Sequence, residues 1–141
     1  MTAGPQDDTE IMSLLARLGR RTDDPDRARD DLSRVVWSCL AEPGDAVAGM
    51  LIDALGADEA LRAACAARPS RAAPDAAGIP LADWGDALKR WRPRVTAPDA
   101  AHALRIAVTR GIRLVTPADA HWPRAVDDLG AHRPICLWVR G

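Results

Sequence analysis

The chain has 141 residues and is 48% apolar, yet it has no Phe or Tyr and only five Trp, and its Ala- and Arg-rich composition favours helices. Its net charge of −1 hides an uneven distribution of charge along the chain: residues 1–31 carry about −3, residues 32–88 about −4 and residues 89–141 about +6. A basic C-terminal part of this kind suits a polyanionic partner. No apolar run approaches the roughly 20 residues of a membrane span, and no signal peptide is visible. The three scattered cysteines argue against a disulfide framework. We therefore expect a cytoplasmic protein with no membrane partner.

Residues 1–25 are expected to form an acidic, partly disordered extension. Residues 1–9 combine Gly, Pro and Asp, which is typical of a disordered terminus. Apolar residues then recur at helical spacing from Ile11 to Leu18 and predict a short amphipathic helix. The sequence leaves open whether this helix docks on the rest of the chain.

Residues 26–110 are expected to form a helical domain of about five helices. The first helix is predicted over 26–42, where Leu32, Val36 and Leu40 belong to one continuous apolar stripe. We expect this stripe to be covered by the apolar face of a later helix, which carries Trp84, Leu88 and Trp91.

Capping signals divide the remainder of this domain. Asp45 is a plausible N-cap for the second helix and Gly56 fits its C-terminal end. Thr96 opens a capping-box pattern before the last helix, and residues 68–79 are predicted to be a loop. The helices after the first are predicted over 46–55, 58–67, 81–91 and 96–110.

The pattern changes in residues 111–141, which predict strand, short helix and strand over 112–116, 122–130 and 135–139. The last segment is apolar throughout, which is typical of a strand buried on both faces inside a parallel sheet. We expect it to pair with residues 112–115 or with another chain.

The segment 89–94, Lys-Arg-Trp-Arg-Pro-Arg, is the strongest local signal for chemistry. A nucleic-acid base can stack on an indole while guanidinium groups hold phosphates. The alternative is structural, since Trp91 completes the apolar face of its helix and cations suit a helix C-terminus.

Catalytic and metal-binding signals are weak. His102, His121, His132 and Cys136 do not follow a compact zinc pattern, and Cys39 lies on the apolar stripe. No nucleophile elbow, phosphate loop or dinucleotide fingerprint occurs. We therefore expect neither an enzyme nor a bound cofactor.

Two stretches carry a resemblance to a known family. Residues 111–119, the pair Trp122-Pro123 and residues 137–141 resemble the entry into the Rossmann-like domain of the DNA-processing family DprA, also called Smf. Residues 32–45, with Leu55-Gly56, look like the helical N-terminal domain of actinobacterial members.

The resemblance implies a sterile-alpha-motif-like, helix-hairpin-helix-related bundle, followed at residues 111–141 by a truncated start of a Rossmann-like α/β domain. It also implies binding of single-stranded DNA and loading of the recombinase RecA during DNA uptake in natural transformation. The family's main DNA-contact residues follow the strand that here ends at Gly141, so only structural positions carry over. These positions are Gly111, Asp119, Trp122, Pro123, Leu137 and Gly141.

Two functions follow as hypotheses. The first is the N-terminal portion of a DprA-like protein, either a fragment or a natural truncation, acting on single-stranded DNA. The alternative is a helical protein-interaction module without DNA binding of its own, and self-association also stays open. Clustering of the basic residues on one surface would favour DNA. The candidate nucleic-acid contacts are Lys89, Arg90, Trp91, Arg92, Arg94, Arg113 and Arg140.

Overall fold

The computed structural model describes residues 5–95 and 97–141 and is mainly helical. The α-helices are α1 (Pro5–Arg17), α2 (Pro25–Leu40), α3 (Ala46–Leu55), α4 (Ala57–Cys65), α5 (Ala72–Ala77), α6 (Leu81–Trp91) and α7 (Ala97–Arg110). Two 3₁₀ segments, η1 (Arg92–Arg94) and η2 (Arg124–His132), and two strands, β1 (Ile112–Val115) and β2 (Leu137–Arg140), complete the fold.

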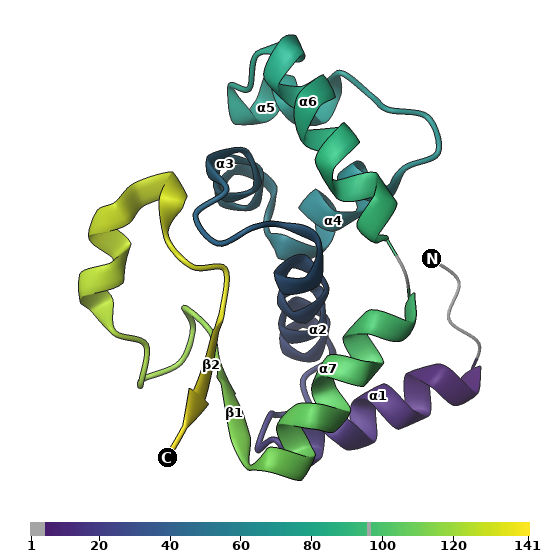
Figure 1. The fold of residues 1–141 in the computed structure, drawn as a ribbon, viewed down its shortest axis with the longest axis vertical. Coiled ribbons are helices and arrows are strands. Elements are labelled where there is room, and N and C mark those ends of the chain that lie inside the picture. Colours follow the sequence, from purple (N-terminus) through teal and green to yellow (C-terminus); the bar gives the residue numbers. More distant parts are fainter. Residues whose placement is uncertain (1–4, 96) are drawn as a thin grey trace.

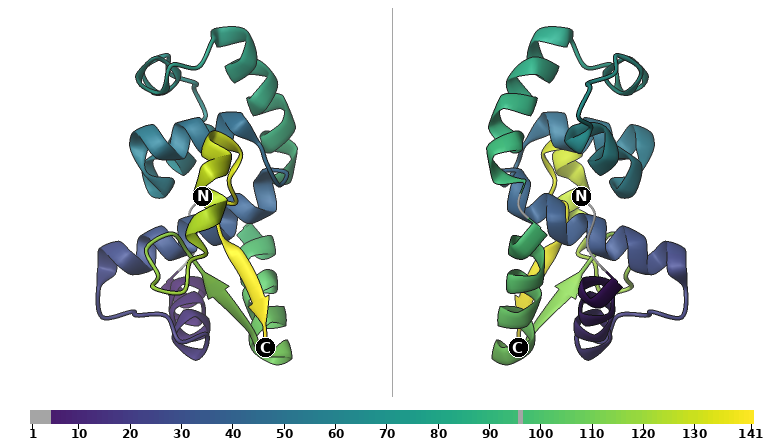
Figure 2. Two further views of the ribbon diagram at one scale, coloured as in Figure 1. Left: turned by 90° about the vertical axis from the view of Figure 1, so that its left-hand side faces the viewer. Right: turned by 90° about the vertical axis from the view of Figure 1, so that its right-hand side faces the viewer.

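Helix α2 lies at the centre of the molecule and contacts both α4 and α7 (Figure 1). Helix α3 contacts α4, α5, α6 and η2. Figure 2 shows α5 and α6 at one end of the molecule, and α1, α7 and the two strands at the other end. The fold is therefore elongated along one direction, with α2 joining its two ends.

The helix boundaries in the centre of the chain follow the capping signals. The Asp24 carboxylate accepts hydrogen bonds from the backbone N–H groups of Asp26 and Arg27, so α2 begins at Pro25. Asp45 caps α3 in the same way, as predicted, and Gly56 ends that helix with φ of 81°. The capping role predicted for Thr96 lies outside the described residues.

The predicted loop over residues 68–79 is wrong in part, because it contains helix α5. Residues 25–110 thus hold six described α-helices where about five were expected. Pro74 lies in the first turn of α5, where a helix does not need its N–H, and its side chain is buried. Gly78 ends the helix in the left-handed region, with φ of 68°.

The N-terminal helix is docked on the rest of the chain. Helix α1 begins at Pro5 and packs against α7, so residues 5–9 are helical where disorder was expected, and residues 1–4 lie outside the description. Ile11, Leu14 and Leu15 are buried in the same core as α2 and α6. Burial of this apolar face holds the helix in place.

The aromatic face of α6 is buried in the core, but the prediction that it covers the Leu32, Val36 and Leu40 stripe of α2 is wrong in part. Helix α6 packs mainly against α3, and its aromatic contact on α2 is Trp37. Trp84, Leu88 and Trp91 are all buried. The ring of Trp91 meets that of Trp37 edge to face, with 5.0 Å between centroids. Trp37 is fully buried and donates its indole N–H to Ala57 O over 3.0 Å, so it anchors α2 to both α4 and α6.

The two strands pair with each other, which confirms the pairing predicted for residues 135–139 with 112–115. The pair is antiparallel, with Ile112 opposite Arg140 and Val115 opposite Leu137. The expectation of a strand buried on both faces is wrong, because every residue of β2 is at least partly exposed. The short helix predicted over 122–130 is the 3₁₀ segment η2, and Gly130 breaks its helical geometry.

Candidate functional site

The basic side chains predicted to contact nucleic acid begin at the C-terminal end of α6. Lys89, Arg90, Arg92 and Arg94 are exposed there and along η1. The opposite face of α6 is apolar and buried. This amphipathic pattern explains why the cations point outward, and cations at a helix C-terminus also interact favourably with the helix dipole.

The indole of Trp91 is not part of this basic surface. Its side chain is only 1% exposed, it packs against Trp37 and Trp84, and its Nε1 donates to Asp45 Oδ2 over 3.0 Å. A base can stack on an aromatic ring only where one face of the ring meets solvent. The sequence pattern therefore holds a core tryptophan between exposed arginines.

The loop between α2 and α3 brings acidic groups to the basic segment. The Asp45 carboxylate is 6% exposed, caps α3, accepts from Trp91 and lies 3.3 Å from the Arg90 guanidinium. Glu42 of the same loop pairs with Arg94. Two of the four predicted cations are thus matched by carboxylates within the molecule.

Arg92 and Lys89 complete this region. The Arg92 guanidinium donates to Ala66 O over 2.8 Å, at the end of α4. Lys89 makes no ion pair or hydrogen bond with the residues that the structure describes. The surplus positive charge of the segment is therefore small and is concentrated on these two side chains.

Arg113 and Arg140 lie elsewhere, on the two-stranded sheet. Arg113 stands opposite Val139, whereas Arg140 stands opposite Ile112. Because neighbouring positions along a strand point to opposite faces, these registers place the two arginines on opposite faces of the sheet. The predicted contacts therefore do not share one surface.

A buried ion-pair network ties both ends of the chain to α2, and the sequence patterns did not reveal it. Arg20, 8% exposed, lies 2.8 Å from Asp31 and 2.7 Å from Asp119, which come from α2 and from the turn after β1. Arg27 also pairs with Asp119, over 2.6 Å. The network spans about 100 residues of sequence and therefore has no local signature.

The electrostatics at Asp119 and Arg20 favour the charged forms of these two groups. Burial raises the pKa of Asp119, but hydrogen bonds from Arg20 and from the backbone N–H of Thr116 outweigh burial and hold it below its usual range. Burial likewise opposes the charge on Arg20, yet its bonds to Asp31 and Asp119 raise the pKa of the guanidinium. Asp119 and Arg20 are therefore both charged at neutral pH.

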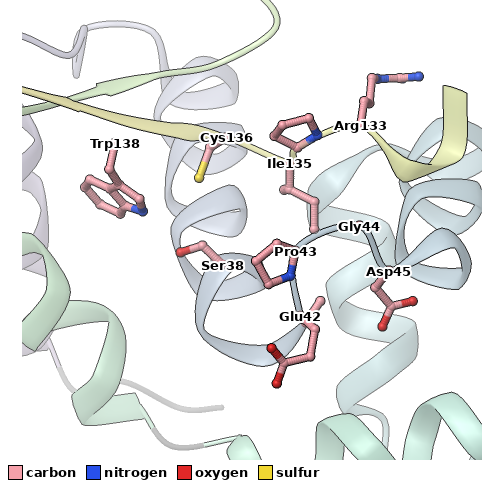
Figure 3. Close-up of a pocket in the computed structure, with 11 residues that line it drawn as sticks. Ser38, Glu42, Pro43, Gly44, Asp45, Arg133, Ile135, Cys136 and Trp138 are labelled. Carbon is pink, nitrogen blue, oxygen red and sulfur yellow. The ribbon is translucent and has the colours of Figure 1, made fainter. Parts of the chain in front are cut away.

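A cavity of about 220 Å³ separates the C-terminal end of α2 from the segment that leads into β2. Figure 3 shows Ile135 and Cys136 above it, with Ser38 and Pro43 below. Burial raises the pKa of the Cys136 thiol to about 11, so the thiol is protonated at neutral pH and is a weak nucleophile. The lining is mainly apolar.

Among the described residues, His, Cys, Asp and Glu do not gather in a group of three that could hold a metal ion. Likewise, none of the described helices has the length and apolar character needed to cross a bilayer.

Comparison of the chain with protein-family models, with curated proteins and with solved structures finds no match.

Proposed function

We propose that this chain is a helical protein-interaction module of a DprA-like DNA-processing protein and does not itself provide the main surface for single-stranded DNA. The observation that carries the proposal is the distribution of the candidate contacts. Trp91 is buried, Arg90 and Arg94 pair with the α2–α3 loop, and Arg113 and Arg140 occupy opposite faces of the sheet.

Phosphate contacts need several cations that can reach one strand at the same time. The arrangement in this chain instead uses its arginines to join elements to one another. RecA is the partner that the family resemblance implies, and a second copy of the chain is the other. Either would dock on a fold whose N-terminal and C-terminal segments are both held to α2 by the ion pairs around Arg20.

Fluorescence anisotropy of a labelled oligo-dT, titrated with the chain at low and high salt, tests the first half of the proposal. We expect no binding at micromolar protein at either salt concentration. Binding that weakens steeply with salt would overturn it. Titration of RecA with the labelled chain, and sedimentation of the chain alone, then identify the protein partner.

Direct contact with single-stranded DNA is the second candidate function, and the exposure of Lys89 and Arg92 favours it. The double variant Lys89→Gln/Arg92→Gln removes this surplus charge. The matched control, Arg29→Gln/Arg62→Gln, removes the same charge from exposed positions on α2 and α4. Loss of oligo-dT binding in the first variant alone would establish the DNA surface.

A further inference from the structure

A cleft of about 290 Å³ runs along β1 on the side away from β2. Its walls are the segment from Leu18 to Arg20, which follows α1, and the turn from Asp119 to His121. Arg113, Leu114 and Val115 of β1 all line it. Because consecutive strand residues alternate between faces, three in a row place the cleft at the edge of the strand.

The hydrogen bonds along the edge of β1 indicate that one backbone donor of the strand faces this cleft. Arg20 Nη1 donates to Leu114 O over 3.1 Å, and two positions further on the Thr116 N–H donates to Asp119 Oδ2 over 2.7 Å. Both bonds point away from β2. In an antiparallel pair the N–H and C=O of one residue point to the same edge, so the Leu114 N–H also faces the cleft.

The charges around the cleft leave a positive surplus. Asp31 and Asp119 are matched by Arg20 and Arg27, so these four groups sum to zero. Arg113 is exposed and forms no ion pair with any residue that the structure describes. The imidazole of His121 is exposed at the same wall and is a further hydrogen-bonding group.

We propose that this cleft binds a phosphate group. The Arg113 guanidinium supplies charge and two parallel donors, the Leu114 N–H supplies a fixed backbone donor, and the His121 ring supplies another from the opposite wall. Guanidinium and backbone N–H groups together form strong oxyanion sites. Donors from separate directions suit a tetrahedral anion better than a planar carboxylate. The phosphate belongs either to a small molecule or to a nucleic-acid backbone.

Titration of the ¹⁵N-labelled chain with inorganic phosphate, at constant ionic strength set with chloride, tests this site. We expect saturable shifts of the Leu114 and His121 amide signals. Arg113→Gln should weaken binding at least about tenfold, as the loss of one charge-assisted bidentate pair predicts. Arg140→Gln, an equal charge change on the other face of the sheet, should leave affinity within about twofold. Linear shifts without saturation, or equal losses in both variants, would overturn the proposal.

Titration with oligo-dT then separates the two sources of phosphate. If oligo-dT saturates the same signals at a lower concentration of phosphate groups than inorganic phosphate does, the site is assigned to a nucleic-acid backbone. Phosphate binding without any response to oligo-dT would assign it to a small molecule. Lys89→Gln/Arg92→Gln should leave the phosphate titration unchanged, so that failure of this site and failure of the proposed function remain distinguishable.

Discussion

Arg20 holds Asp31 by two parallel hydrogen bonds inside the molecule. Arg20 Nε lies 2.9 Å from Asp31 Oδ2 and Arg20 Nη2 lies 2.8 Å from Asp31 Oδ1. The Asp31 side chain is fully buried and that of Arg20 is 8% exposed. Since Arg20 follows α1 and Asp31 belongs to α2, this pair fixes the first helix against the centre of the fold.

Asp31→Asn should destabilise the protein strongly. The substitution preserves shape but leaves Arg20 and Arg27 to share the single carboxylate of Asp119. Removing one partner of a buried ion pair costs up to about 3–5 kcal/mol. Urea unfolding followed by tryptophan fluorescence measures the change. Asp23→Asn is the control, because Asp23 pairs with Arg21 where both side chains are more than two-thirds exposed, and its unfolding midpoint should not move. A loss below about 1 kcal/mol for Asp31→Asn would contradict the expected role of the pair.

Acid should weaken the fold partly through Asp119. Its pKa in the folded protein lies below the usual value, because the bonds from Arg20 and Thr116 outweigh burial. A carboxyl with a lowered folded pKa contributes stability above its unfolded pKa of about 3.9 and loses it as pH falls through the folded pKa. The free energy of unfolding should therefore decline below about pH 4. Asp119→Asn should be less stable at pH 7 and show a shallower decline, and equal slopes for both proteins would disprove this.

The elements that the sequence predicted correctly are those with local causes. Asp45 caps α3 because its carboxylate reaches N–H groups two and three residues away, and α6 ends near Pro93 because of proline geometry. The strand pairing was also predictable, because the sequence contains only two predicted strands and each needs a partner for its backbone hydrogen bonds. The two helix signals lie within a short stretch of sequence, whereas the two strands are separated by η2.

The features that were missed depend on contacts between residues far apart in the sequence, or on burial that offsets an unfavourable local signal. Arg20 meets Asp119 across 99 positions, and no periodicity marks such a pair. Pro74 suggested a loop, although its position in a first turn and its burial allow a helix. Trp37 adjoins the predicted stripe and is one of only five Trp, so a wider apolar face would have included it. The burial of Trp91 depends on Asp45 and Trp37, which reach it from other elements and leave no mark in the segment 89–94.

Removal of the Asp45 carboxylate should loosen the contact between α3 and α6. Asp45→Ala removes the N-cap of α3, worth about 1 kcal/mol, and leaves the buried indole N–H of Trp91 without its acceptor, which costs about another 1–3 kcal/mol. Asp45→Asn retains an acceptor oxygen and should lose less than half as much. Thermal unfolding of the two variants gives the comparison. Equal losses would show that charge, rather than hydrogen bonding, dominates at this position.

Gly49 should be intolerant of a side chain because η2 lies directly on α3. A Cβ at Gly49 would overlap the carbonyl oxygen of Ala131, so Gly49→Ala must push η2 away from the helix. Overpacking of this kind costs about 1–3 kcal/mol. Gly85, in α6, is the matched control, because a Cβ there meets no atom within 4 Å. Gly85→Ala should stabilise the protein by up to about 1 kcal/mol through helix propensity. Hydrogen exchange should also show faster exchange in η2 for Gly49→Ala alone, and unchanged protection there would mean that η2 is held by other contacts.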